Sequence, residues 1–443
     1  MAVRLQPVPL ILTALAFLSV IPRSSAQPPH SALTLKDALG LTVKNSSMVL
    51  QAEQAVYGAE AKASESRSPL YPQMNVQSSY ARLGPISSFS LDIPPMPPVT
   101  MKFGNENSYN VGISLQHSLF NWGRTQTGIE MGELGVRISE TALATTQTAA
   151  AYQVIQAFYG ILLSHESLRV FDQTIQALQT RKAMMKRRYE SGLMSNFDLL
   201  TMDVQIAGIE GRKLEIETSL RKLEILFNKL TGRPLDMPVA LAGQIEEQSY
   251  AFNTDSLLHA ALESRGELRQ AALQEDLARR QADMARTADK PNIAVNASYL
   301  LRNGLFPNLD ALRGTWNASI VLAYPAFDGF RTSAQVDQAE VNVRVTELRR
   351  AELEQSVAMD VRQAIVDLQS NKQRIQIEKV RLEQAKEALE IATERHAGGF
   401  LSTIDLLDSQ MSYENAHLGY LQAITNHILA KYAIDRVTGK KFL

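Results

Sequence analysis

The longest periodic pattern in the sequence lies between Phe330 and His396, a stretch that contains neither proline nor glycine. Apolar residues recur there in steps of three and four, interrupted only by Asn371 and Glu378. The recurring positions are Val357, Val361, Ala364, Leu368, Asn371, Ile375, Glu378, Leu382, Ala385, Leu389 and Ala392. A seven-residue apolar repeat predicts helices packed side by side as in a coiled coil. At about 1.5 Å per residue this helix would be roughly 100 Å long, far beyond an ordinary globular helix.

The same pattern occurs earlier in the chain, at an offset of 207 residues that takes Arg124 to Arg331. Its apolar positions are Ala150, Val154, Ala157, Ile161, Leu168, Phe171, Ile175, Leu178 and Met185. The flanking segments match as well, 120–124 with 327–331 and 188–200 with 395–407. A repeat of constant length predicts two helical hairpins whose tips end at the same level. The expected helices are 123–189 and 195–231 in the first hairpin, and 330–396 and 402–437 in the second.

Four shorter stretches alternate between apolar and polar residues, at about 73–83, 108–119, 292–302 and 315–324. In the clearest of them, Tyr109, Val111, Ile113 and Leu115 alternate with Asn110, Gly112, Ser114 and Gln116. Such alternation over about ten residues predicts strands of a transmembrane β-barrel, with lipid on one side and water on the other. Two hairpins of a soluble sandwich are the alternative. A stretch of helical character precedes each strand pair, Leu35 to Ser68 and Ser256 to Lys290, and prolines end both.

A proline-rich loop from Leu83 to about Asn107 separates the first two strands, and a shorter loop from Asn303 to Arg313 separates the last two. Four strands are too few to close a barrel, and open sheet edges cannot face hydrocarbon. The strands must therefore be pooled between copies of the chain. Three copies would give twelve strands and two copies eight, and the spacing alone does not choose between them.

Residues 1–26 are typical of a cleaved secretory signal peptide, with Arg4 before an apolar run and small residues up to Ala26. An uncleaved anchor is the alternative. The chain has no cysteine, which excludes disulfides, a catalytic thiol and the acylated cysteine of a lipoprotein. Cleavage would remove two of the 45 basic residues and none of the 46 acidic ones, and this near-neutral balance does not indicate nucleic acid binding. No later apolar run reaches about 18 residues, so any membrane-spanning part is expected to be β-structure.

In this order of elements the sequence resembles the TolC-like outer membrane efflux proteins. The resemblance covers nearly the whole chain after the signal peptide, including the Phe-Asn/Asp-x-x-Arg segments, the glycine-containing tips and the closing Thr-Gly pairs. It implies a mainly α, mixed fold: a trimeric 12-stranded barrel continued by a long coiled-coil α-barrel, with an α/β equatorial domain that includes the termini. The implied domains are the signal peptide 1–26, a first repeat 27–232, an equatorial linker 233–253 and a second repeat 254–443.

The function implied by this resemblance is a passive exit channel of a tripartite efflux pump or a type I secretion system. The implied partners are two further copies, a periplasmic adaptor, an inner-membrane transporter of the RND, ABC or MFS type, and outer membrane lipid. A non-conducting envelope spacer with a β anchor is the alternative, but only a water-filled lumen needs Asn110, Ser114 and Gln116 inside. A simple porin would not need hairpins of roughly 100 Å.

Asp405 and Asp408 lie three residues apart on the helix after Gly399 and therefore share one face. They resemble the aspartate rings that narrow the periplasmic entrance in the family. Three copies would gather six such carboxylates around one axis, which favours cations. Two solvated aspartates near a helix N-terminus are the alternative.

Asp198, the first-repeat counterpart of Asp405, resembles one member of the family's gating link. The tyrosine and arginine partners of that link are replaced here by His396 and Leu401, so the link is not carried over intact. A pair between Asp198 and His396 would depend on pH near 6 to 7. A plain surface histidine is the alternative.

The hairpin turns carry apolar residues at exposed ends, which predicts a surface for a partner, and the resemblance implies that the adaptor docks there. Their residues are Gly192, Leu193, Met194 and Ser195, and Gly399, Phe400, Leu401 and Ser402. Burial against neighbouring tips is the alternative. No catalytic motif, cofactor site or metal-ligand spacing is present in the sequence, and an enzyme is not expected. Trp122 and Trp316, at strand ends, are expected at the membrane interfaces.

Overall fold

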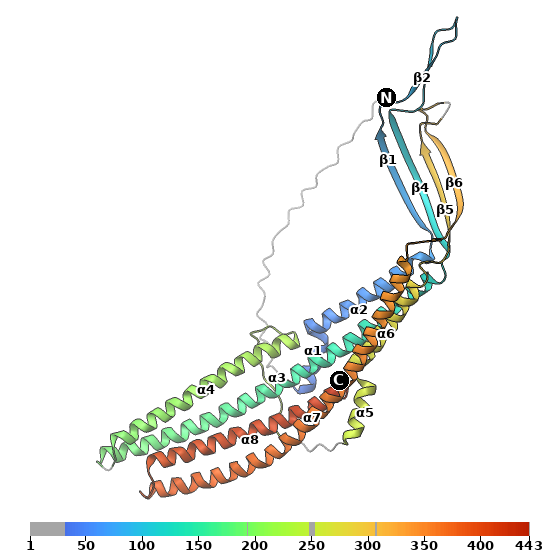
Figure 1. Cartoon of the computed structure of the whole chain (residues 1–443). Coiled ribbons are helices and arrows are strands. Elements are labelled where there is room, and N and C mark those ends of the chain that lie inside the picture. The colour runs from blue at the N-terminus through green and yellow to red at the C-terminus, as the bar shows by residue number, and fades with distance from the viewer. Residues whose placement is uncertain (1–31, 193, 248–252, 306–307, 443) are drawn as a thin grey trace, which may run out of the picture.

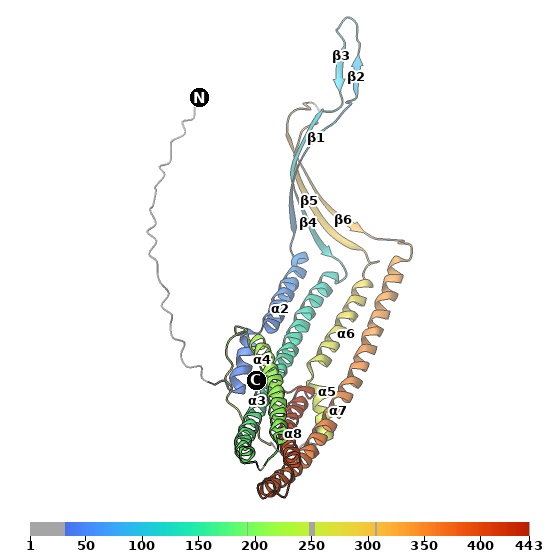
Figure 2. The same cartoon turned by 90° about the vertical axis from the view of Figure 1, so that its left-hand side faces the viewer.

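The computed structural model of the protein describes residues 32–192, 194–247, 253–305 and 308–442. Helices that run side by side form an elongated, bowed body, and a small sheet stands at one end of it (Figures 1 and 2). The predicted signal peptide 1–26 and the tip residue Leu193 lie outside the described residues, as does part of the predicted linker.

Two long helices, α3 (Arg124–Glu190) and α7 (Arg331–Ala397), run through this body and have the same length of 67 residues. Each begins one residue later than predicted, because left-handed backbone turns precede both. An aromatic residue adopts this conformation in each repeat, Trp122 with φ of 54° and Phe330 with φ of 66°. The conformation costs a bulky residue on the order of 1 kcal/mol, so the direction of the turn is set against a local preference.

The return helices α4 (Asn196–Thr231) and α8 (Thr403–Val437) complete the two hairpins. Ser195 and Ser402, predicted as first helical residues, are instead their N-caps. Each hydroxyl accepts a hydrogen bond from a backbone N–H of the first turn. Such a cap satisfies an N–H group that has no partner within the helix.

The helical stretch predicted before each strand pair is confirmed as helical, and the structure shows in addition that each stretch is broken once. The four helices are α1 (Leu35–Asn45), α2 (Ser47–Ser66), α5 (Thr254–Ser264) and α6 (Gly266–Ala285). At each break, the backbone packs against the glycine that follows a return helix. A Cβ atom on Gly232 would lie 2.5 Å from the carbonyl oxygen of Asn45, and one on Gly439 would lie 2.9 Å from that of Ser264. The breaks are therefore set by tertiary contacts that local sequence does not encode.

The predicted apolar seams of the long helices are confirmed as core. Val154 and Ile161 of α3 and Val361 and Ile375 of α7 have no exposed surface. Helices α2 and α6 pack along the half of the body nearer the sheet, and α4 and α8 along the far half (Figure 1). Between these halves, Leu33 and Leu241 form a parallel bridge, and the segments near both termini and the linker share one core.

Four strands form one antiparallel sheet in the order β1, β4, β5, β6. Their bounds are β1 (Gln73–Arg82), β4 (Asn107–Phe120), β5 (Asn292–Arg302) and β6 (Arg313–Ala323), and a short 3-10 turn, Ser68–Leu70, leads into β1. The two hairpins join through β4 and β5. Strands β1 and β6 are consequently the two open edges of the described sheet.

The segment predicted as a proline-rich loop contains a hairpin of its own, which projects beyond the main sheet (Figure 2). Its strands are β2 (Ser88–Leu91) and β3 (Val99–Lys102). The four clustered prolines lie between these strands, where no ladder N–H is needed. No helix in the described ranges is both long enough and apolar enough to cross a membrane.

Candidate functional site

The main sheet has one apolar face, whose rows follow from the strand register. Val76 pairs with Ile113, Ile113 with Tyr299, and Tyr299 with Trp316. These side chains are exposed, Trp316 by 79% and Val76 by 72%. The neighbouring row consists of Met74, Leu115, Ala297 and Ala318. An exposed apolar surface of this extent indicates contact with another apolar phase.

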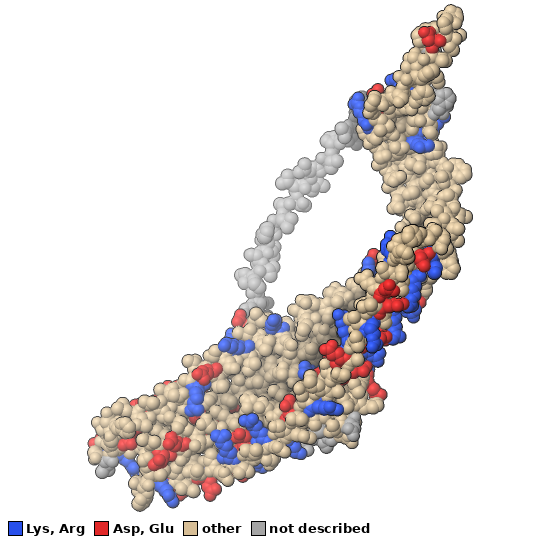
Figure 3. Space-filling view, in the orientation of Figure 1, with Lys and Arg blue, Asp and Glu red and all other residues tan. Residues whose placement is uncertain are grey.

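The opposite face of the sheet is polar. Its rows are Asn75, Ser114, Ser298 and Asn317, and Gln73, Gln116, Asn296 and Ser319. Charged residues lie on this face only at the end remote from the helices, where Arg302 of β5 stands opposite Arg313 of β6 in the strand register. Charged side chains are spread along the helices but are sparse on the visible part of the sheet (Figure 3). Amide and hydroxyl groups can exchange hydrogen bonds with water, so the sheet can separate water from an apolar phase.

The predicted entrance residues lie at the other end of the molecule. Asp405 and Asp408 are both exposed in the first turns of α8. Asp405 also belongs to the helix cap, since its carboxylate accepts a hydrogen bond of 2.6 Å from the hydroxyl of Ser402. Their spacing keeps both carboxylates on one side of the helix.

Asp198 lies in the first turn of α4 and His396 near the end of α7, and within the described chain they do not form the predicted pair. The Nε2 atom of His396 lies 3.4 Å from the hydroxyl of Thr403 instead. Burial lowers the pKa of His396, and the charges of Arg188 and Arg181 lower it further, whereas Asp198 raises it by less. Together these effects disfavour the protonated ring and weaken its attraction to Asp198.

The two hairpin turns are less apolar on their surface than their sequences suggest. Phe400 is 85% exposed, but Met194 packs into the core of the hairpins and Leu401 is half-buried. Gly192 and Gly399 provide the left-handed backbone of the turns, with φ of 73° and 80°. Among the described residues of the two turns, Phe400 is the one large apolar side chain that is mostly exposed.

Arginines of α3 tie the two hairpins of one chain together near the tips. The guanidinium of Arg181 donates to Gln410 Oε1 at 3.0 Å and to Thr393 Oγ1 at 3.2 Å. Arg188 donates to the carbonyl oxygen of Ala397 at 3.2 Å. All three acceptors belong to the second hairpin, so separating the hairpins would break these bonds. Sequence reasoning missed this seam.

A buried ion pair closes the same seam farther from the tips. Glu414 of α8 has no exposed surface, and its Oε1 lies 2.8 Å from Arg212 Nη1 of α4. Burial raises the pKa of Glu414, and the charge of Arg212 opposes this only in part. The first-repeat counterpart of Glu414 is Ala207. A glutamate at a position that is alanine in the other repeat is the sequence signal that could have revealed the ion pair.

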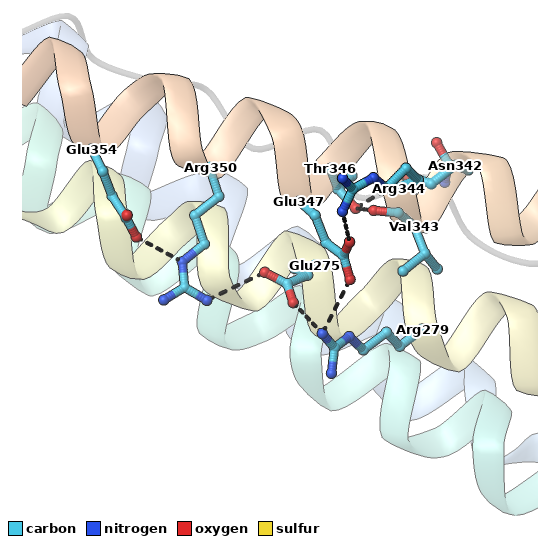
Figure 4. Close-up of polar contacts among 9 residues, drawn as sticks. All are labelled: Glu275, Arg279, Asn342, Val343, Arg344, Thr346, Glu347, Arg350 and Glu354. Carbon is cyan, nitrogen blue, oxygen red and sulfur yellow. Dashed lines mark hydrogen bonds and ion pairs between the residues drawn. The ribbon is translucent and has the colours of Figure 1, made fainter.

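A second ion-pair cluster joins α6 to α7 in the half nearer the sheet (Figure 4). Its centre is Glu275, which is nearly buried and accepts from Arg279 at 2.5 Å and from Arg350 at 3.2 Å. Arg279 also contacts Glu347, and Arg350 contacts Glu354. Because the arginines are about half exposed, each outer pair stabilises this contact only weakly.

Two exposed apolar stripes with heptad spacing lie on the hairpins. They are Phe197, Leu200, Val204 and Leu214 on α4, and Val366, Ile377, Val380 and Ile391 on α7. The second-repeat counterparts of Leu200 and Leu214 are Leu407 and Leu421, and both are buried. The first-repeat counterparts of Val366 and Ile377 are Tyr159 and Val170, which are buried too. At these four positions the stripes repeat a face that is covered elsewhere in the same chain, whereas Ile404 and Met184, the counterparts of Phe197 and Ile391, are exposed as well.

No group of three or more histidine, cysteine, aspartate or glutamate side chains in the described part of the chain is arranged to hold a metal ion. The polar groups that converge do so as caps, ion pairs and hydrogen bonds between helices.

A two-faced sheet mounted on two long helical hairpins is the architecture of an outer membrane channel. The family model for the outer membrane efflux protein matches residues 38–233 and again residues 257–440. The chain therefore belongs to the outer membrane efflux protein family. It is a channel-family protein of the outer membrane and not an enzyme.

Individual relatives are distant but cover most of the chain. The outer membrane protein TolC of Escherichia coli K12 is 20% identical over 389 residues, which span 85% of this chain and 76% of TolC. The cation efflux system protein CusC of Escherichia coli O157:H7 is 20% identical over 388 residues, with 85% and 80% covered.

Solved structures share the fold at similarly low identity. The CmeC outer membrane channel of Campylobacter jejuni superimposes with a TM-score of 0.78 at 16% identity, over 91% of this chain and 85% of CmeC. The outer membrane protein VceC of Vibrio cholerae gives 0.75 at 16% identity, over 92% of this chain and 97% of VceC.

Proposed function

We propose that the protein is the passive exit channel of a tripartite efflux pump or a type I secretion system, and that it conducts solutes across the periplasm and the outer membrane. The observation that carries this proposal is the polar face of the sheet. A spacer with a dry β anchor, the alternative, would gain nothing from rows of asparagine, glutamine and serine on the face opposite the lipid. The channel does no chemistry and lowers the barrier to solute passage.

The proposed assembly is a homotrimer. The open edges β1 and β6 need partners in an apolar phase, and pairing them between copies removes both edges. Two copies would form an eight-stranded barrel, and side chains fill the interior of a barrel of that size. The twelve strands of three copies would leave room for water. The stripes on α4 and α7 support the same ring, since α8 packs on α3 within one chain and α4 would pack on α7 of the next.

The proposed entrance is the ring of Asp405 and Asp408 at the tips, held narrow by the arginine seam, with Asp198 and His396 beside it. Phe400 and the other tip residues, 192–195 and 399–402, are the proposed docking surface for a periplasmic adaptor. That adaptor would connect the channel to an inner-membrane transporter of the RND, ABC or MFS type. Relatives named as a cation efflux protein and a cobalt-zinc-cadmium resistance protein make metal cations one candidate class of substrate.

We further propose that residues 1–26 are a cleaved signal peptide and that the mature chain carries no lipid anchor. The absence of cysteine from the sequence supports the second point, although one relative is named as a probable outer membrane lipoprotein, SilC of Salmonella typhimurium.

Single-channel conductance in a planar bilayer tests the proposal. The wild type is compared with the double variant Asp405→Ala, Asp408→Ala and with Glu210→Ala, which removes an exposed carboxylate from the body of α4. We expect discrete conductance that prefers cations in the wild type and in Glu210→Ala. Removing six carboxylates from the constriction should reduce the cation-to-anion permeability ratio severalfold.

Unchanged selectivity in the double variant would move the constriction away from Asp405 and Asp408. If the folded wild type does not conduct, the seam variant Arg181→Ala separates a closed channel from a spacer. A closed channel should begin to conduct, whereas a spacer should stay silent.

A further inference from the structure

A groove of about 500 Å³ lies where the second repeat passes from sheet to helix. We call it the junction groove. The residues after α6 form one wall, including Asp289 and Lys290, and the connection from β6 to α7 forms the other, including Tyr324, Phe327 and Phe330. The groove therefore adjoins the end of the apolar sheet face.

The aromatic residues of the junction groove are unusually exposed. Phe327 and Phe330 are 77% and 75% exposed, and their rings meet edge to face with centroids 5.6 Å apart. Tyr324, also exposed, continues the apolar column of β6 that contains Trp316 and Ile320. Amphipathic and aromatic side chains at this level of a membrane-embedded sheet are typical of the interface between acyl chains and headgroups.

The groove also presents both signs of charge. The ammonium of Lys290 lies 3.5 Å from the carboxylate of its neighbour Asp289, and Asp337 of α7 is exposed on the opposite wall. Arg286 is already engaged by Glu340 at 2.8 Å and by Asp283 at 3.1 Å, so Lys290 is the cation available to a ligand. A purely anionic headgroup would meet Lys290 but also the three aspartates that line the groove, Asp289, Asp328 and Asp337.

We propose that the junction groove binds one phospholipid with a zwitterionic aminoalkyl phosphate headgroup. Lys290 receives the phosphate, Asp337 and Asp289 receive the ammonium, and the acyl chains run along Tyr324 and the apolar column of β6. This inference rests on the proposed function in one respect, namely that the apolar sheet face is turned toward lipid. Mixed charges beside exposed aromatic rings match such a headgroup better than an anionic one.

The first repeat provides an internal comparison. Lys290 stands one residue before Pro291, and Tyr71 stands at the same place before Pro72. Leu70 correspondingly replaces Asp289. The first repeat thus has exposed apolar residues at this level but no counterpart of Lys290 or Asp289, although Glu130 stands in the place of Asp337. A lipid whose phosphate needs the ammonium of Lys290 should therefore select the second repeat.

Native mass spectrometry of the full chain, purified and delipidated in detergent, tests the proposal. Phosphatidylethanolamine, phosphatidylglycerol and phosphatidylcholine are titrated separately. We expect one phosphatidylethanolamine bound per protomer, with affinity reduced roughly tenfold in Lys290→Ala and in Phe327→Ala. The matched first-repeat variant Tyr71→Ala should bind as the wild type does, and Lys290→Arg, which keeps the charge, should retain most of the affinity.

Several results would overturn the site. Equal retention of all three lipids, preference for phosphatidylglycerol, or insensitivity to Lys290→Ala would each reduce the groove to ordinary lipid contact. A change in oligomer size in Phe327→Ala, without lipid selectivity in the wild type, would make the groove an interface between copies. Circular dichroism establishes that each variant is folded. Conductance of the same preparations distinguishes the two proposals. Selective lipid binding by a protein that does not conduct would contradict only the proposed channel function. Conductance without selective lipid binding would contradict only the lipid site.

Discussion

At the scale of single residues, the Thr-Gly pairs that close both repeats have a physical explanation in the structure. Gly232 and Gly439 have left-handed backbone, with φ of 69° and 72°, and each lies against the break between two short helices. A side chain at either position would meet backbone atoms that cannot move aside. These glycines therefore fix how the return helix meets the short helices in the middle of the molecule.

Gly232→Ala is expected to lower the free energy of unfolding by about 3 kcal/mol. The left-handed conformation accounts for about 1 to 2 kcal/mol of this, and the overlap with Asn45 for the rest. The control is Gly58→Ala, in the exposed interior of α2 with open space around it, which should be stabilising by about 1 kcal/mol. Midpoints of thermal unfolding, followed by circular dichroism in detergent, would measure both. Equal effects of the two substitutions would contradict this explanation.

At the tips, local sequence decided where the aspartates lie on their helix, while their role at an entrance stays a prediction. The spacing of Asp405 and Asp408 put both on one exposed side of α8, because helix geometry alone decides this. Asp198 and His396 form no ion pair in the described chain, where the charges of Arg188 and Arg181 lower the pKa of His396 and the charge of Asp198 raises it by less. Those arginines come from α3, and no local sequence pattern in α4 or α7 predicts that they lie near His396.

At the scale of elements, long uniform patterns were predicted well and their interruptions were not. The heptads fixed α3 and α7 to within one residue, since a period repeated over many turns leaves little freedom of register. The breaks at Ser46 and Arg265 and the hairpin of β2 and β3 escaped prediction. The two breaks depend on contacts with distant glycines. The hairpin has clustered prolines in its turn, and a sequence of this kind is typical of an irregular loop.

The contact between α4 and α8 gives an element-scale prediction that depends on pH. The pKa of Glu414 is raised by burial above its ordinary value of 4.5. A carboxyl group with a raised pKa holds its proton more tightly when folded, so the free energy of unfolding falls as pH rises from 4.5 to the raised pKa. Glu414→Gln should remove this fall, and Arg212→Ala should steepen it and cost about 2 kcal/mol at neutral pH.

Urea unfolding from pH 4 to 8 would measure this dependence. Glu210→Gln serves as the control, because Glu210 is exposed on α4. If Glu414→Gln and the wild type keep parallel profiles, the carboxyl group of Glu414 does not set the stability of this seam.

At the scale of the whole molecule, a single chain leaves several surfaces without a packing partner. The sheet ends in two open edges, and the hairpins carry two exposed apolar stripes, in which the repeat counterparts of Leu200, Leu214, Val366 and Ile377 are buried. Sequence periodicity revealed the repeat, yet which copy of each face is covered follows only from the three-dimensional order of the helices. Ring closure by a head-to-tail contact is what such a pair of different surfaces permits.

A charge placed in either stripe should therefore prevent assembly without unfolding the hairpins. Leu214→Glu on α4 and Val366→Glu on α7 would each bury an unpaired carboxylate between copies, and we expect association to weaken at least tenfold, by roughly 1.4 kcal/mol or more per contact. Met184→Glu, at an exposed position of α3 outside both stripes, is the control and should assemble normally. Light scattering with size-exclusion chromatography in detergent measures the mass of each. Because the contact is head-to-tail, either substitution alone should suffice, and equal amounts of the two variants should form at most one intact contact per pair of chains. A full-sized ring from Leu214→Glu or from Val366→Glu would mean that the copies meet through other faces.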